Sequence, residues 1–257
     1  MGLATLPAGL DGFFWLLLLL GPFLIVQRGL HREVQAIFLL ITRRADIALA
    51  LFSLSFFPGI LLHEGSHYLT ARLCGVRTGR FSLIPRPLDD GRLQLGFVET
   101  APADWLREAL IGIAPLLTGG LFVAYAGLVR LGLLTLWQAL VSGGAAALIE
   151  ALPGVFDQPD YWLWFYLTFT ISSTMLPSAS DRRAWLPLGL VMASLLALSL
   201  LVGAGPWLMA NLAKPLNMVL KAIAVVFGIS MLIHLLLLLP LWGLHLGISR
   251  LTKMDVV

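Results

Sequence analysis

Residues Ala48–Leu73 read ALALFSLSFFPGILLHEGSHYLTARL, and this stretch decides what kind of fold the chain adopts. A run of apolar side chains comes first, and His63, Glu64 and His67 follow it within the same segment. A helix of about 20 apolar residues crosses the hydrocarbon layer of a bilayer. Ionisable residues inside such a helix are costly and usually mark function. The stretch therefore predicts a membrane helix that carries a functional site.

The composition of the whole chain agrees with a membrane protein. Of its 257 residues, 59% are hydrophobic and 12% are charged, whereas a soluble domain carries about 25% charged residues. The apolar runs are continuous rather than alternating, so spanning helices are favoured over the strands of a barrel. The net charge of +3 is small, and we expect the basic side chains to meet lipid headgroups of the bilayer rather than nucleic acid.

We expect an all-α polytopic membrane protein with about six transmembrane helices and a small β-hairpin after the helix of residues 48–73. Residues 1–257 would form a single membrane-embedded domain, with residues 48–183 as its core and residues 184–257 as two further transmembrane helices. A seventh segment, Leu136–Val155, is interrupted by a Pro-Gly pair and is expected to be a loop helix or a partial insertion. The six expected spans are Phe13–Val26, Ala48–Leu73, Ala109–Leu134, Tyr161–Leu176, Leu186–Ala210 and Val219–Ile248.

The stretch Arg77–Asp104 has the character of strands rather than of a spanning helix. Apolar side chains alternate with polar or small ones over Leu93–Phe97, and Asp90-Gly91 immediately before them is a turn signal. Phe81–Ile84 is the expected partner strand. An ordinary polar loop is the alternative.

The spacing of His63 and His67 is typical of a metal site. On a helix the two imidazoles lie one turn apart on the same face and can share one Zn²⁺, with Glu64 beside them to take a proton from water at the metal. Zinc lowers the pKa of such a water to about 7. Catalytic zinc also needs a third protein ligand. The acidic candidates for it are Glu99, Glu108, Glu150, Asp157, Asp160 and Asp181.

Asp181 is the candidate that its position favours. It follows an apolar helix whose last turns contain Pro177, and proline can loosen those turns and let the carboxylate turn toward a site within the membrane. The alternative is a helix-terminal charge beside Arg182-Arg183.

Three stretches, in order, resemble motifs of the site-2 protease family of intramembrane zinc metalloproteases. His63–His67 carries the His-Glu-x-x-His motif, Ile113–Thr118 is similar to the family's Gly-Pro-x-x-Asn segment, and Thr174–Asp181 is similar to its Asn-x-x-Pro-x-x-x-Asp-Gly segment. The resemblance covers roughly Leu51 to Arg183. The flanking helices match only as apolar segments.

This resemblance implies a site and a reaction. One Zn²⁺ per chain would be bound by His63, His67 and Asp181, and Glu64 would be the general base. The activity would be that of an endopeptidase that cuts a transmembrane or membrane-adjacent segment of a membrane-protein substrate. A helical peptide bond is shielded, so the hairpin would hold the substrate extended by strand addition.

The sequence departs from the family pattern at three positions. Thr118 and Thr174 stand where the family has asparagines, and Arg182 stands where it has glycine. Together with Pro115 and Pro177, the two threonines are the residues expected to bind substrate or the oxyanion. Losing one oxyanion donor can cost about 10²–10³ in rate. We expect an active but divergent member.

Two other functions stay open. A membrane metalloprotease of the prenylated-protein type would use Glu150 as its third ligand. A non-catalytic metal-binding scaffold, or a transporter with intramembrane His and Asp, would need no general base. His234 and His245 are about 16 Å apart along one helix, too far to share a metal, and we expect each to have other polar partners.

The expected location is a prokaryotic-type cell membrane, in a multi-pass arrangement. If the N-terminus lies inside and six helices alternate in direction, ten of the 17 Lys and Arg residues lie inside and seven outside. Basic residues are enriched on the cytoplasmic side of membrane proteins. This count favours a site that faces the cytoplasm.

Overall fold

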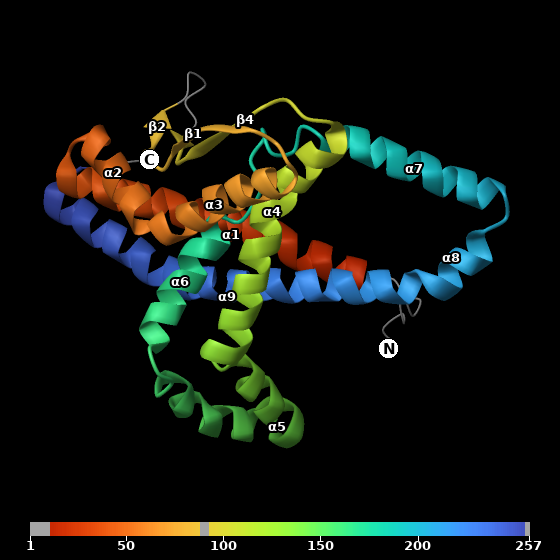
Figure 1. The fold of residues 1–257 in the computed structure, drawn as a ribbon. Coiled ribbons are helices and arrows are strands. Elements are labelled where there is room, and N and C mark those ends of the chain that lie inside the picture. The colour runs from red at the N-terminus through yellow and green to blue at the C-terminus, as the bar shows by residue number, and fades with distance from the viewer. Residues whose placement is uncertain (1–10, 88–92, 255–257) are drawn as a thin grey trace.

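The computed structural model describes residues 11–87 and 93–254, which form mostly helices with a few short strands (Figure 1). This confirms the expected class, an all-α polytopic membrane protein with a small β-hairpin. The helices are α1 (Asp11–Thr42), α2 (Ala45–Ser55), α3 (Phe57–Leu73), α4 (Trp105–Tyr125), α5 (Leu133–Phe156), α6 (Tyr161–Thr174), α7 (Trp185–Leu201), α8 (Gly205–Asn211) and α9 (Ala213–Thr252). A π-helical turn, Ala126–Arg130, continues α4. The strands are β1 (Thr78–Ser82), β2 (Arg86–Pro87), β3 (Leu93–Gln94) and β4 (Phe97–Thr100).

Several of the described helices are long and apolar enough to cross a membrane. Four qualify singly, namely α1, α4 with its π-helical turn, α5 and α9. The pairs α2–α3 and α7–α8 also qualify if each counts as one span, which gives up to six. Helix α6 has 14 residues and is about 21 Å long, which is shorter than the hydrocarbon core. The span expected over Tyr161–Leu176 is therefore too short to cross by itself.

Helix α5 corresponds to the segment expected to be a loop helix or a partial insertion. It covers 24 residues but is interrupted at Gly144, where φ is 68° and ψ is −157°. Positive φ is strained for residues with a Cβ and readily adopted by glycine. The segment is therefore helical on both sides of a kink rather than one continuous rod.

Two of the expected spans are broken in the structure. The helix expected over Ala48–Leu73 bends by 71° between α2 and α3, where Pro58 occupies the first turn of α3. Proline has no N–H for the preceding turn, and its ring clashes with the carbonyl four residues back. The helix expected over Leu186–Ala210 bends by 117° between α7 and α8, where Gly203 has a φ of 82°. Each of these two expected spans is therefore a pair of helices joined at a bend, for these local reasons.

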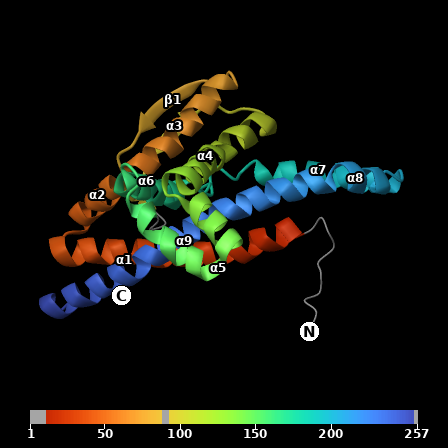
Figure 2. The ribbon, with the colours of Figure 1, turned by 90° about the horizontal axis from the view of Figure 1, so that it is seen from below.

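Helices α1 and α9 form a long parallel pair, seen side by side in Figures 1 and 2. The backbone N–H of Gly12 donates to Asn217 Oδ1 at 2.7 Å, and His245 pairs with Glu33 at 2.5 Å near the other end. Residue numbers rise together in both helices, so the helices run in the same direction. Two spans with the same direction are separated by an odd number of others. If α1 and α9 both cross the membrane, six helices cannot simply alternate in direction, so the count of basic residues does not orient the chain.

The strands form two short antiparallel ladders, β1 with β4 and β2 with β3. The expected hairpin is present, but the strand expected over Leu93–Phe97 is divided between β3 and β4. Its main partner is Thr78–Ser82, slightly earlier than the expected Phe81–Ile84. The expected turn at Asp90-Gly91 lies outside the described residues.

Close helix packing places α6 against α3 and α4. At Gly59 of α3, a Cβ would collide with the Thr170 carbonyl and the Thr174 hydroxyl of α6. At Gly119 of α4, a Cβ would lie 2.5 Å from Met175 Cβ. Small residues let membrane helices approach closely, because lipid supplies no hydrophobic force between them. The end of α6 is therefore brought within reach of the polar residues of α3.

We expect Gly59→Ala to destabilise the protein by about 1–3 kcal/mol, because the added methyl group has no space beside α6. Gly65→Ala is the matched control on the same helix, since nothing lies within 4 Å of a Cβ built there. Thermal unfolding of both variants in detergent measures the difference. Equal midpoints for the two variants would contradict the close α3–α6 contact.

Candidate metal centre

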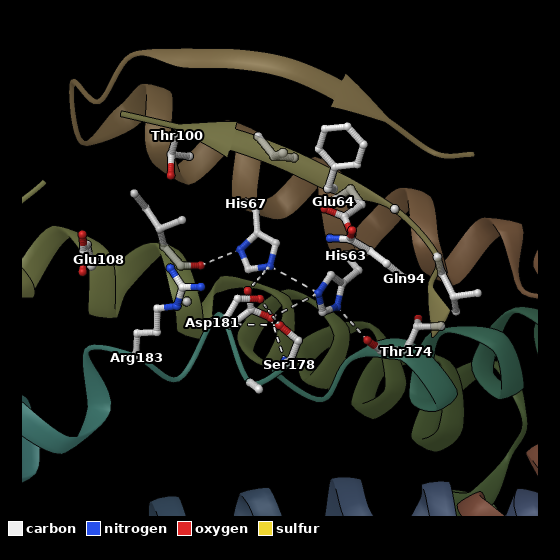
Figure 3. Close-up of a pocket in the computed structure, with 18 of the residues that line it drawn as sticks. His63, Glu64, His67, Gln94, Thr100, Glu108, Thr174, Ser178, Asp181 and Arg183 are labelled. Atoms are coloured by element: carbon white, nitrogen blue, oxygen red, sulfur yellow. Dashed lines mark hydrogen bonds and ion pairs between the residues drawn. The ribbon is translucent and has the colours of Figure 1, made fainter. Parts of the chain in front are cut away.

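Three side chains from two distant parts of the chain converge on one point, as Figure 3 shows. His63 and His67 lie one turn apart on α3, with their Nε2 atoms 3.2 Å apart. Asp181, in the loop after α6, places Oδ1 3.3 Å from His67 Nε2 and Oδ2 3.6 Å from His63 Nε2. Ligand atoms around tetrahedral zinc, with bonds of about 2.0–2.1 Å, are about 3.3 Å apart. The three residues could therefore hold a metal ion, and their spacing suits zinc.

Backbone carbonyls orient both imidazoles. His63 Nδ1 donates to the Thr174 carbonyl at 2.6 Å, and His67 Nδ1 donates to the Ile111 carbonyl at 2.8 Å. A carbonyl can only accept, so in each neutral ring Nδ1 carries the hydrogen and Nε2 carries a lone pair. Two lone pairs 3.2 Å apart repel each other unless a cation lies between them. This arrangement, with Nδ1 bonded and Nε2 converging, is typical of metal-ligating histidines.

The loop that carries Asp181 is held close to α4. Its carboxylate accepts from the Ser178 N–H at 2.7 Å, and Gly112 of α4 lies against the Asp181 carbonyl, where any Cβ would clash. Burial raises the pKa of the Asp181 carboxyl, but the imidazoles of His63 and His67, when protonated at Nε2 in the metal-free protein, and the Ser178 N–H lower it by more. The pKa is held well below its usual range, so the carboxyl is ionised at neutral pH, as a metal ligand must be.

Glu64 lies beside the cluster without belonging to the ligand set. Its side chain is 8% exposed and lies between α3 and the chain that leads into β4 (Figure 3). Gly96 covers it so closely that a Cβ there would come 2.8 Å from Glu64 Cγ. A carboxylate next to the ligands and not used by them is available for proton transfer.

A cavity of about 850 Å³ opens beside these residues. Its walls come from α3, the β3–β4 segment, the first half of α4, the end of α6 and the loop before α7. Thr100, Glu108 and Arg183 lie toward one end and Gln94 toward the other (Figure 3). Sites for small molecules typically have volumes of about 300–1,000 Å³. The cavity is therefore as large as an ordinary ligand site.

The residues expected to bind substrate or the oxyanion are not all at this cavity. Thr118 and Pro115 lie on α4 away from the described residues that line it, and the Thr118 hydroxyl donates to its own helix at 2.9 Å. Thr174 lines the cavity, but its hydroxyl donates to the Thr170 carbonyl of its own helix. Its carbonyl accepts a hydrogen bond from His63. Pro177 follows in the loop before Asp181. The binding role of these residues stays a prediction.

Asp181 joins the two histidines, and the other acidic candidates lie elsewhere. Glu150 is exposed on α5, which Figure 1 shows at the far end of α4 from the strands. Glu99 pairs with Arg80 on β1 at 2.7 Å, and Glu108 lines the cavity outside the ligand cluster. The turn between α5 and α6 contains the remaining two, Asp157 and Asp160.

Some residues that build the site were not recognised in the sequence. The carbonyls of Ile111 and Thr174 are backbone groups, and nothing in the residue types marks them as partners of the histidines. Gly96 and Gly112 read as ordinary small residues until their neighbours Glu64 and Asp181 are known. Only contacts between distant segments identify such residues.

Comparison with known proteins leaves the family open. No family model matches the chain, and no curated protein and no solved structure matches it either. The resemblance to site-2 proteases therefore rests on the motifs alone.

Purified wild-type protein in detergent should contain about one zinc ion per chain. Asp181→Ala should lose the metal, because two imidazoles alone leave the site without its third ligand. Glu150→Ala is the control and should keep it, since Glu150 lies on another part of the fold. Metal analysis of the three proteins gives the result, and zinc loss from Glu150→Ala with retention in Asp181→Ala would reject the assigned ligand set.

Proposed function

We propose that this chain is an intramembrane zinc-dependent endopeptidase and a divergent relative of the site-2 proteases. The observation that carries the proposal is the convergence of His63, His67 and Asp181, with Glu64 beside them, on the wall of a cavity. The surrounding helices are apolar enough for a bilayer. The substrate would be a membrane protein, cut within or beside a transmembrane helix.

The chemistry follows from the roles that the side chains can take. Zinc held by the three ligands would polarise the scissile carbonyl and lower the pKa of a water molecule. Glu64, beside the ligand cluster, would accept the proton of the attacking water and return it to the leaving amide nitrogen. His63 and His67 keep one tautomer, because their Nδ1 atoms are bonded to carbonyls. Asp181 would supply one negative charge against the two positive charges of the cation.

The cavity supports an extended substrate. Strand β4 runs along it, with Val98 and Thr100 among the lining residues, while β1 pairs with β4. A peptide laid beside a strand is held by main-chain hydrogen bonds and must be unwound. An unwound segment exposes the carbonyl that a helix would shield. The strand therefore suits a protease that acts on helical membrane segments.

The charges near the site favour a cytoplasmic orientation. Six basic residues lie at the helix ends and in the strand and loop that border the cavity or adjoin it, whereas residues 126–160, at the far end of α4, hold one, Arg130. Basic residues concentrate on the cytoplasmic side of membrane proteins. A prokaryotic-type cell membrane stays the expected location. The basic residues concerned are Arg72, Arg77, Arg80, Arg107, Arg182 and Arg183.

Glu64→Gln should keep the metal and lose proteolysis by about 10²–10⁴-fold, because glutamine retains the shape but cannot accept the proton. The measurement compares the membrane proteins of cells that produce wild type or Glu64→Gln and maps new N-termini. Wild type should generate N-termini within apolar spans, and the variant should not.

Glu150→Gln is the matched control, since it makes the same change at an exposed carboxylate on α5, away from the cavity. It should still cleave. If cells with wild type and cells with Glu64→Gln yield the same new N-termini, with zinc present in both proteins, the protease proposal is rejected. A metal-binding scaffold or a transporter is then favoured.

A further inference from the structure

The last turn of α6 presents two neighbouring carbonyls to two different helices. The Thr174 carbonyl accepts from His63 Nδ1 of α3 at 2.6 Å, and the Ser173 carbonyl accepts from Gln27 Nε2 of α1 at 2.6 Å. The last carbonyls of any helix have no partner within it. In a membrane they must find one elsewhere, because lipid offers none. Gln27 therefore satisfies the carbonyl adjacent to the one that orients a metal ligand.

The side chain of Ser173 adds a second attachment, to α9. Its hydroxyl lies 2.9 Å from His234 Nε2, and His234 Nδ1 donates to the Ser230 carbonyl at 2.7 Å. Nδ1 is thus the protonated nitrogen, and the Ser173 hydroxyl donates to Nε2. The neighbouring hydroxyls behave differently, because each donates to a carbonyl of α6 itself. They are those of Thr168, Thr170, Ser172 and Thr174.

Both attachments are buried among apolar side chains. Gln27 is 7% exposed and His234 is fully buried. The His234 ring lies edge-on to Phe23 at 5.2 Å and tilted against Phe169 at 5.3 Å. Polar groups in such surroundings are costly unless they are bonded. Ser173 is therefore held in one place by α1 and α9, while close packing at Gly59 limits α6 on the side of α3.

We propose that Gln27 and His234 are positioning residues for the metal centre. By holding Ser173, they keep the Thr174 carbonyl at His63 Nδ1, and this bond aims His63 Nε2 at the other two ligands. The inference rests on the metal centre of the proposed function and on no property of the substrate. It gives α1 and α9, which lie outside residues 48–183, a direct part in building the site.

The test is a Co²⁺ titration of the metal-free, full-length protein in detergent, followed by the visible absorption of the bound ion. Gln27→Met has nearly the same shape but no donor, and it should weaken Co²⁺ binding about tenfold, the low end of the range for loss of a ligating histidine's direct partner, because Gln27 acts one bond further out. Its spectrum should also change, because His63 is no longer held at one angle. Gln35→Met is the matched control, exposed on the same helix, and should bind like wild type.

A second background separates positioning from general destabilisation. In His63→Cys protein, which keeps three ligands, Gln27→Met should cause no further loss of Co²⁺ affinity, because a thiolate has no Nδ1 for the Thr174 carbonyl to orient. A loss of the same size in both backgrounds would overturn the proposal. Ser173→Ala removes only the His234 contact and should weaken Co²⁺ binding by a smaller factor. If Gln27→Met does not fold, unchanged affinity in Ser173→Ala overturns the role of His234 and a weakened one supports it.

The outcomes also separate this inference from the proposed function. Wild-type protein that binds no Co²⁺ would remove the metal centre and both proposals with it. Wild-type protein that binds Co²⁺, with equal affinity and spectrum in Gln27→Met, would overturn the positioning role and leave the protease proposal standing.

Discussion

The hydrogen bond from His63 Nδ1 to the Thr174 carbonyl is the contact on which the metal centre depends. It sets the tautomer of His63 and aims Nε2 at His67 and Asp181. It also requires the end of α6 to lie directly beside α3. Asp181 follows α6 by a few residues, so the same approach brings the third ligand to the two histidines. The packing of α6 against α3 therefore also fixes the positions of the metal ligands.

That approach is possible because glycines stand where helices touch. Gly59 admits the last turn of α6 to α3, and Gly112 admits the Asp181 loop to α4. In a bilayer, helix association depends on close packing and polar contacts rather than on removing apolar surface from water. Replacing either glycine would move a ligand as well as weaken the fold. Stability and metal geometry are thus linked at the same positions.

The flanking helices contribute a parallel scaffold. The pair α1–α9 is joined near its start by Asp11 and Lys221 and near its end by Glu33 and His245. Polar contacts of this kind define a register that apolar surfaces alone would leave free to slide. Between these contacts, Gln27 of α1 reaches α6. If α1 and α9 both cross the membrane, their shared direction requires an odd number of crossings from α1 through α9.

The sequence by itself determined the helical class, because long apolar runs must satisfy their backbone groups internally in lipid. It also determined that His63 and His67 share a face, since four residues make about one turn, and it favoured Asp181 by position. Only the tertiary structure decided the bends near Pro58 and Gly203, the strand partners, the shared direction of α1 and α9, and the carbonyls that orient the imidazoles. Apolar runs and the spacing of two histidines are local properties of the chain. The bends, strand partners, helix directions and carbonyl contacts depend on segments that are far apart in sequence.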